Sequence, residues 1–161
     1  MYRIRQATKE DVNRMAEIES LCFPAEEAAS LDKFQNRFAA FGECFFVLEV
    51  DGLVVGHING CIYDEPELPD ALYSDTSLHR PNGAYQTVFG LAVEPHFQRR
   101  GYASALTKHF IEVSRTNKRE GMVLTCKDYL VEFYSNMGFD HKGVSASSHG
   151  GARWNDMVLT F

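Results

Sequence analysis

One segment, from Thr87 to Ser104, constrains the fold of this chain more than any other. It continues a strand-like stretch over Tyr85–Glu94, which Pro95 ends, and leads into a strongly periodic helix predicted over Gly101–Lys118. A short apolar run, Met122–Cys126, then predicts a buried strand. Two strands joined through a helix pair in parallel by a right-handed crossover. This strand–helix–strand unit predicts a mixed α/β fold.

The rest of the chain supplies antiparallel strands and covering helices. Asp51-Gly52, between two apolar runs, matches a two-residue type I′ hairpin turn. The Pro-rich and acidic stretch 64–84 predicts a long loop with one short helix near Ala71. We expect a single domain over residues 1–161, with a mixed, mostly antiparallel sheet flanked by helices. The other expected strands span 2–6, 45–50, 53–63, 139–144 and 154–161, and the other expected helices 12–21, 26–40 and 130–137.

The charge balance is acidic: 16 Lys and Arg against 22 Asp and Glu give a net charge of −6. An acidic protein repels nucleic acid and anionic membranes at long range, so neither is an expected partner. A cationic substrate would be attracted instead. We expect a small-molecule amine as the partner, and a monomer or homodimer as the assembly.

The four cysteines show no spacing typical of a metal site, and we expect no metal. No apolar run approaches the roughly 20 residues that a membrane helix needs, and no signal peptide is recognised. These features predict reduced thiols and a cytoplasmic protein. Cys126 lacks an evident histidine partner and is interpreted as a packing residue.

The turn before the long helix has the composition of an anion site. Arg99 and Arg100 supply positive charge, and Gly101 lets a ligand approach the backbone without a Cβ in the way. The first N–H groups of a helix have no partner and carry a positive partial charge, which suits a pyrophosphate. A solvated basic turn before an amphipathic helix is the alternative interpretation.

Gln98-Arg99-Arg100-Gly101-Tyr102-Ala103 resembles the (Q/R)xxGx(G/A) coenzyme A motif of the GNAT superfamily of N-acetyltransferases. The strand residues Leu91-Ala92-Val93 and the order of elements also match that superfamily, so the resemblance implies a GNAT-like acyl-CoA N-acyltransferase fold. The chain is most similar to the serotonin (arylalkylamine) N-acetyltransferase branch. That similarity also rests on the segments 23–30, 124–128 and 133–139.

The resemblance implies acetyl-CoA as cosubstrate and assigns residues to it. The backbone of Leu91, Ala92 and Val93 would pair with the pantetheine arm like an added strand. Tyr134 would lie beside the coenzyme sulfur and donate a hydrogen bond or a proton to the departing thiolate; packing in the core is the alternative. The residues expected around the pyrophosphate are Gln98, Arg99, Arg100, Gly101, Tyr102, Ala103 and Ser104.

The amine must lose a proton before it can attack. An alkylamine with a pKa near the lysine value of about 10.4 is protonated at pH 7, and reaching the neutral form costs roughly 4–5 kcal/mol. The vertebrate serotonin enzymes use two histidines where this chain has Thr87 and Phe89. Glu26, Glu27 and His149 are the candidates for this role here, directly or through water.

Together these features predict an acetyl-CoA-dependent N-acetyltransferase that acts by direct attack of the amine in a ternary complex. The expected acceptor is a small arylalkylamine or polyamine, bound between residues 23–30 and the region of His149. Phe23 and Pro24 would offer apolar surface, and Glu26 charge for the ammonium. The alternatives are acetylation of a protein or peptide amine, and a non-catalytic acyl-CoA-binding regulatory module.

Overall fold

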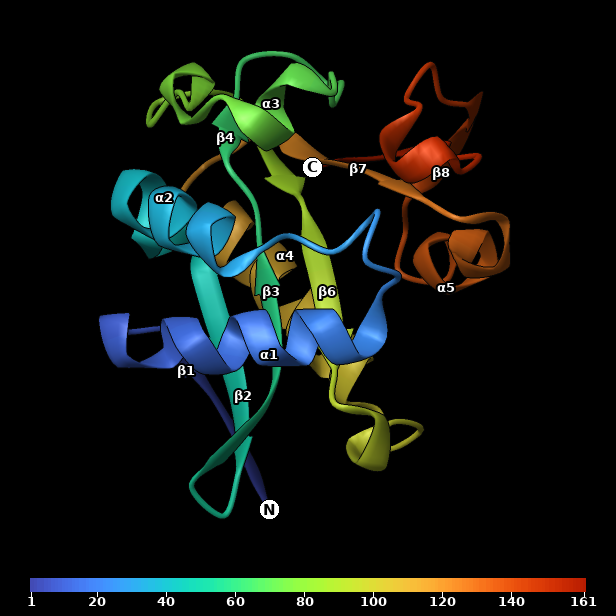
Figure 1. Cartoon of the computed structure of the whole chain (residues 1–161). Coiled ribbons are helices and arrows are strands. Elements are labelled where there is room, and N and C mark those ends of the chain that lie inside the picture. Colours follow the sequence, from blue (N-terminus) through green and yellow to red (C-terminus); the bar gives the residue numbers. More distant parts are fainter. The chain divides into compact units, whose positions relative to one another are not determined.

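Two compact units make up the chain in the computed structural model, which describes residues 1–161 (Figure 1). The first unit contains residues 1–60 and 89–110, and the second contains residues 61–88 and 111–161. Each unit has its own sheet. The mixed α/β class with mostly antiparallel strands flanked by helices is confirmed, although one sheet was expected and two are found.

The sheet of the first unit is antiparallel, with the strand order β1-β2-β3-β6. Asp51 and Gly52 join β2 to β3 with φ values of 51° and 83°, the positive values that a type I′ turn requires. The predicted hairpin is therefore confirmed. These strands are β1 (Tyr2–Gln6), β2 (Phe45–Val50), β3 (Leu53–Asn59) and β6 (Gly90–Val93).

Two helices of the first unit are α1 (Val12–Cys22) and α2 (Leu31–Phe41), and α1 crosses in front of β3 and β6 (Figure 1). Met15 and Ile18 of α1 are fully buried. α2 begins five residues after the predicted Glu26, because Ser30 caps it by accepting a hydrogen bond from the Lys33 N–H (3.3 Å). The residues before Ser30 form a turn instead of a helix.

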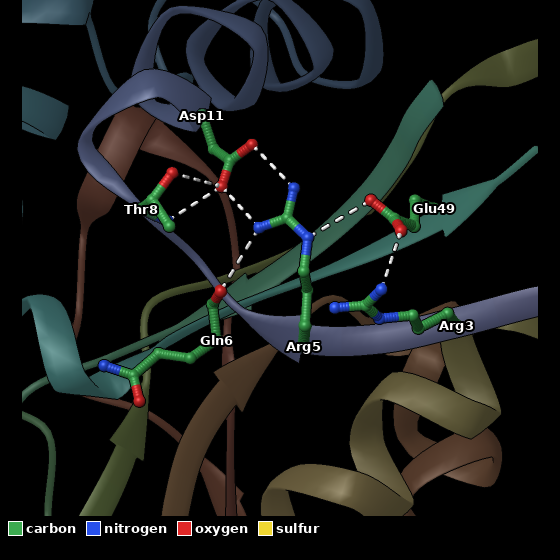
Figure 2. A network of polar contacts seen from close by, with 6 residues as sticks. All are labelled: Arg3, Arg5, Gln6, Thr8, Asp11 and Glu49. Carbon is green, nitrogen blue, oxygen red and sulfur yellow. Dashed lines mark hydrogen bonds and ion pairs between the residues drawn. The ribbon is translucent and has the colours of Figure 1, made fainter. Parts of the chain in front are cut away.

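A polar network ties the start of α1 to β1 and β2 (Figure 2). The Arg5 guanidinium donates to both carboxylate oxygens of Asp11, at 2.7 and 3.0 Å, and to Glu49 at 3.1 Å. The same Asp11 accepts the Thr8 N–H at 2.8 Å, as in a capping box. Arg3 adds an ion pair to Glu49 at 3.8 Å. We call these five residues the Arg5 network.

The second unit holds a five-stranded sheet in the order β4-β5-β7-β9-β8. β5 and β7 are parallel, as the sequence predicts, and every other pair is antiparallel. The strands are β4 (Ile62–Tyr63), β5 (Tyr85–Val88), β7 (Gly121–Cys126), β8 (Asp140–Val144) and β9 (Asn155–Thr160).

The short helices of the second unit are α3 (Ala71–Ser74), as predicted near Ala71, and α5 (Val131–Ser135). The long helix α4 (Tyr102–Thr116) begins in the first unit and ends in the second. None of the helices is both long and apolar enough to cross a membrane. Six 3₁₀ turns complete the chain: Lys9–Asp11, Gly42–Cys44, Thr76–Leu78, Pro95–Phe97, Asp128–Leu130 and His149–Gly151.

Two strands predicted as continuous are each divided between the sheets. The run 53–63 breaks after Asn59 into β3 and β4, and the run 85–94 breaks at Phe89 into β5 and β6. The Phe89 N–H donates to the Asn59 carbonyl at 2.7 Å, so the two breaks face each other. Both runs keep a strand-like composition on either side of the break, and a glycine next to each break, Gly60 or Gly90, does not by itself tell a change of sheet from a bulge.

Candidate active site

The turn before α4 has an unusual backbone. Gly101 has φ of 81°, and a Cβ there would meet nothing within 4 Å. Arg99 also lies in the left-handed region, with φ of 65°. For a residue with a Cβ this conformation costs on the order of 1 kcal/mol. The turn is thus strained at Arg99 and open at Gly101.

The side chains of this turn are partly engaged within it. The Gln98 amide donates to the Val93 carbonyl at 2.9 Å, and so ties the turn to the end of β6. The Arg100 guanidinium donates to the His96 carbonyl at 3.2 Å and lies 5.2 Å above the ring of Phe97. Gln98, predicted as a ligand-binding residue, therefore also shapes the turn.

The first turn of α4 presents backbone N–H groups beside these arginines. The Ala105 N–H bonds to the Gly101 carbonyl at 3.0 Å, so the amides of Tyr102, Ala103 and Ser104 precede the first bond of the helix. Two exposed arginines and a helix N-terminus give the turn a positive potential. The arrangement suits an anionic group that needs close approach to the backbone.

The strand β6 leads into this turn and forms the edge of its sheet. It pairs with β3 through Leu91–Ile58, Ala92–His57 and Val93–Gly56. No strand of this sheet pairs with its other side. An edge strand can add an extended ligand by backbone hydrogen bonds.

Three polar side chains are buried together where α1 crosses β3. Glu19 is 6% exposed, Asn59 is 2% exposed, and His57 is completely buried. Glu19 Oε2 accepts the Ala29 N–H at 3.1 Å, and the Asn59 amide nitrogen lies 3.3 Å from His57 Nδ1. Glu19 Oε1 and His57 Nε2 stand 3.5 Å apart. We call Glu19, His57 and Asn59 the Glu19 cluster.

One polar atom of each member of the Glu19 cluster has no hydrogen-bond partner: Glu19 Oε1, His57 Nε2 and Asn59 Oδ1. The cluster surrounds Gly90 at the start of β6. A Cβ on Gly90 would lie 3.4 Å from Glu19 Oε1, 3.7 Å from Asn59 Nδ2 and 3.8 Å from His57 Cε1. Unsatisfied buried polar atoms are rare and call for an explanation.

The sequence contained a signal for the Glu19 cluster that the search for motifs missed. Glu19 follows Val12 by seven residues and Met15 by four, so it falls on the buried stripe of α1. His57 and Asn59 are two residues apart in a buried strand, and so share one face. A charge and two polar groups on buried faces mark a candidate site.

The positions that replace the two strand histidines cannot take their role. Thr87 is fully buried, and its hydroxyl donates to the Cys61 carbonyl at 3.0 Å. Phe89 packs against Phe41 and lies 4.8 Å below the Arg37 guanidinium. Neither side chain offers a base.

The residues predicted for the acceptor in the first unit lie in the turn between α1 and α2. Pro24 and Glu26 are exposed, whereas Phe23 and Glu27 are half-buried. The Pro24 carbonyl accepts the N–H groups of Glu27 and Ala28, both at 2.9 Å, and this closes the turn.

Tyr134 in the second unit is buried between aromatic rings. Its ring lies 5.0 Å from that of Phe133 and 5.6 Å from that of Phe139, both edge-on. Burial raises the pKa of the Tyr134 hydroxyl far above its ordinary value, and the nearby Cys126 adds to the shift. Burial also raises the pKa of the Cys126 thiol to about 11, so it is not a thiolate at neutral pH.

His149, also in the second unit, belongs to an aromatic stack. It lies 5.0 Å from the ring of Tyr73 and nearly parallel to it, and 5.9 Å from Trp154. The Trp154 N–H donates to the His149 carbonyl at 2.8 Å. A pocket of about 370 Å³ in the same unit is lined by Glu67, Leu68, Pro69, Asp70, Ser145, Ala146, Ser147 and Asp156.

Residues 12–139 of the chain match the family described as Acetyltransferase (GNAT) family. An uncharacterized N-acetyltransferase, YkwB, of Bacillus subtilis (strain 168) is 24% identical over 131 residues, which are 74% of this chain and 58% of that protein. Serotonin N-acetyltransferase of Mesocricetus auratus is 27% identical over 150 residues, 91% of this chain and 71% of that protein. The chain thus spans little more than half the length of YkwB.

Among solved structures, the chain resembles a GphF GNAT-like decarboxylase in complex with isobutyryl-CoA. The TM-score is 0.85 at 19% identity, and the match covers 98% of each chain. At this identity the similarity concerns the fold.

Proposed function

This chain belongs to the acetyltransferase (GNAT) family, and from that premise we propose that it transfers the acetyl group of acetyl-CoA to a primary amine. The amine would attack the thioester directly in a ternary complex. We further propose that residues 1–161 act as one domain, since the family match runs through both units. We also propose that the protein is a cytoplasmic monomer or homodimer. None of the four cysteines forms a disulfide.

One observation carries this proposal: an unpaired edge strand leads directly into an open, positive turn at a helix N-terminus. Both features belong to the first unit and are joined by fewer than ten residues. Coenzyme A has a matching shape, because it combines an extended amide-containing arm with a pyrophosphate. Leu91–Val93 would pair with the arm, and Gln98–Ser104 would hold the pyrophosphate through backbone N–H groups and arginines.

The chemistry needs a proton donor for the sulfur as the bond to the acetyl group breaks. We propose Tyr134 for this role from the family resemblance. Its hydroxyl is protonated at neutral pH, as an unperturbed phenol also is, and burial raises its pKa further, so a free phenolate is disfavoured. It would therefore donate a hydrogen bond to the departing thiolate, and would pass its proton on only as the phenol oxygen regains one from the acidic nitrogen of the new amide.

We propose a cationic acceptor, an arylalkylamine or a polyamine. The net charge of −6 favours encounter with a cation, and serotonin N-acetyltransferase of Mesocricetus auratus is a relative. Acidic side chains line the pocket of the second unit, among them Glu67, Asp70 and Asp156. Phe23, Pro24, Glu26, Glu27 and His149 remain the proposed acceptor residues.

A turnover screen tests the proposal. Purified protein is mixed with acetyl-CoA or isobutyryl-CoA and a panel of arylalkylamines, polyamines and peptides, and thiol release and acylated product are both measured. We expect product from acetyl-CoA with at least one small amine. Turnover with peptides alone would favour the protein-acetylating alternative, and binding without any turnover would favour a regulatory module.

Two variants test the assigned residues in the same assay. Gly101→Val places a side chain in the open turn in a left-handed conformation that a β-branched residue avoids, so acetyl-CoA affinity should fall at least tenfold by calorimetry. Tyr134→Phe keeps the packed ring and should lower kcat by about 10²-fold or more. Unchanged affinity in the first variant, or unchanged kcat in the second, contradicts that assignment.

A further inference from the structure

We propose that the Glu19 cluster is the site at which the acceptor's ammonium loses its proton, with the Glu19 carboxylate as the proton acceptor. This inference rests on the proposed function, since it assumes an amine acceptor. It assigns the step to none of the residues that the sequence motifs suggested. His57 and Asn59 are positioning residues in this scheme.

The first argument is the free-energy cost of burying the Glu19 cluster. A buried polar group without a hydrogen bond costs roughly 1–3 kcal/mol, and a charged group costs more. The cluster contains three such atoms within a 161-residue chain. A hydrophobic trio of similar volume would pack at this place without that cost, so a ligand that satisfies these atoms explains their retention.

The hydrogen bonds within the cluster assign a role to each side chain. The Asn59 amide nitrogen can only donate, so His57 Nδ1 accepts, and the neutral ring carries its proton on Nε2. That N–H lies on the side of Glu19 Oε1, 3.5 Å away. Together with the Ala29 N–H on Oε2, it orients the carboxylate. Glu19 Oε1 and Asn59 Oδ1 remain as two acceptors for a ligand that donates hydrogen bonds.

A primary ammonium fits this donor–acceptor pattern. It offers three N–H donors and a positive charge, whereas the cluster offers two acceptors, one of them a carboxylate oxygen. The approach is beside Gly90, which is partly exposed and places no Cβ between β6 and the cluster; a Cβ there would already contact Glu19 Oε1 at 3.4 Å. Gly90 immediately precedes Leu91–Val93, the strand proposed to hold the coenzyme arm.

The proton and electron balance of the step is simple. The carboxylate takes H⁺ from R–NH₃⁺, which leaves R–NH₂ and a carboxylic acid. The amine nitrogen forms a bond to the thioester carbon, the C–S bond breaks, and coenzyme A leaves as a thiolate that is then protonated. After the attack, the nitrogen carries two protons, and one of them passes to solvent or to the Tyr134 oxygen to leave the neutral amide. Glu19 becomes a carboxylate again by releasing the proton that it took from the ammonium.

Other titratable or charged groups lie on the elements packed against the cluster. Cys22, one turn further along α1, donates its thiol to the Val93 carbonyl at 3.1 Å. Burial raises the pKa of Cys22, and the Glu19 charge raises it further. From α2, Arg37 lies over Phe89, and Glu27 belongs to the turn whose Ala29 bonds Glu19. None of them is among the three atoms nearest to the Cβ position of Gly90, which all belong to the Glu19 cluster.

Glu19→Gln is the central test, because it keeps the shape and the Ala29 contact but cannot take a proton. Glu17→Gln is the matched control, an identical change on the same helix at an exposed carboxylate that pairs with Arg14. With phenethylamine at pH 7, we expect kcat/KM to fall about 10²–10⁴-fold in Glu19→Gln and to stay within twofold in Glu17→Gln. The difference from wild type should shrink as pH rises and the amine deprotonates unaided.

A weakly basic amine separates proton transfer from a structural role. Trifluoroethylamine is largely neutral at pH 7, so Glu19→Gln should process it within about threefold of wild type. Equal losses on both amines would overturn the proposal, and so would wild-type kinetics with phenethylamine. Acetyl-CoA affinity by calorimetry should be the same in all three proteins.

A binding experiment keeps the inference testable if the proposed function fails. Should wild type acetylate no amine, that function is wrong, and calorimetry with phenethylammonium and coenzyme A then decides about the site. Binding that weakens at least tenfold in Glu19→Gln and in Gly90→Ala, but not in Glu17→Gln, supports the cluster as an ammonium site. A Cβ at Gly90 makes ordinary contacts of 3.4 Å or more, so Gly90→Ala folds. Equal binding in all four proteins, or none, overturns it.

Discussion

The Arg5 network and the Glu19 cluster are two polar groups in the same unit that differ in one respect. In the Arg5 network, shown in Figure 2, the Asp11 and Glu49 carboxylates face guanidinium groups and a backbone N–H. The Glu19 cluster leaves three buried polar atoms without a hydrogen bond, two of which, Glu19 Oε1 and His57 Nε2, stand 3.5 Å apart. A satisfied network stabilises the fold, whereas an unsatisfied one is kept at a cost. The difference assigns the first to stability and the second to chemistry.

The largest expected effect is on kcat, in a variant of the Glu19 cluster. His57→Gln keeps a polar side chain facing Glu19 but removes the ring that orients it, so kcat should fall about 10²-fold, which is about 2.7 kcal/mol in the activation barrier. The free energy of unfolding should fall as well, by about 1–3 kcal/mol, because the fully buried ring packs edge-on against Phe34 and accepts from the Asn59 amide. Steady-state kinetics and urea unfolding measure the two quantities. A large loss of stability with unchanged kcat would reverse the comparison.

Asp11→Asn should lower the stability and leave kcat unchanged. The substitution leaves the Arg5 guanidinium facing a neutral amide and removes one acceptor oxygen, so the free energy of unfolding should fall by about 1–3 kcal/mol. Urea unfolding at pH 7 measures it, and kcat at saturating substrate should stay within twofold of wild type. Lost activity with full stability would place the Arg5 network in the catalytic machinery.

Acidification should remove the contribution of the Asp11 carboxylate to the free energy of unfolding. The hydrogen bonds from Arg5 hold the pKa of the Asp11 carboxyl below its ordinary value, despite the opposing effect of burial. A lowered pKa stabilises the fold above the unfolded value of about 3.9, and this contribution is lost as pH falls through the folded pKa. The stability difference between wild type and Asp11→Asn should therefore shrink between pH 5 and about 2. A constant difference would mean that packing, not charge, carries it.

The smallest expected effect is on the reactivity of the Cys22 thiol, which reports the charge on Glu19. Burial raises the pKa of Cys22 first, and the Glu19 carboxylate raises it further. Neutralising that carboxylate in Glu19→Gln should lower this pKa, so that iodoacetamide modifies Cys22 a few times faster at pH 8, as followed by mass spectrometry. Glu17→Gln serves as the control. Identical rates would mean that Glu19 is already neutral in the folded protein.

Local patterns predicted most of the fold. The hairpin at Asp51-Gly52, the parallel pairing of β5 with β7 and the helix α4 each depend on consecutive residues, and each was confirmed. The start of α2 was wrong because a capping serine outweighed a continuous helical pattern. The change of sheet at Phe89 was missed because a break within a strand-like run depends on tertiary pairing.

One part of the candidate site could likewise be predicted from the sequence, and the other part could not. The turn proposed for the pyrophosphate is contiguous and would act through its backbone, so the six-residue motif Gln98–Ala103 could point to it. The Glu19 cluster combines one residue of α1 with two of β3, around a glycine of β6. Their proximity depends on how α1 crosses the sheet, which no local pattern encodes. A charged residue on a buried helical stripe was the available signal.

The ladder between β3 and β6 has a consequence for how this protein can diverge. Four consecutive pairs, from Gly56–Val93 to Asn59–Gly90, hold the two strands in register. Paired Cα atoms in such a ladder lie about 5 Å apart, so the spacing between the Glu19 cluster and β6, the strand proposed to hold the coenzyme arm, is set by the backbone. Residues 24–26 of the adjoining turn are exposed and lie outside that ladder, and they tolerate substitution more readily than Ala29, whose N–H bonds Glu19. Under the proposed function, a duplicated gene would acquire a new acceptor through changes at residues 24–26 and keep the proposed proton-transfer step.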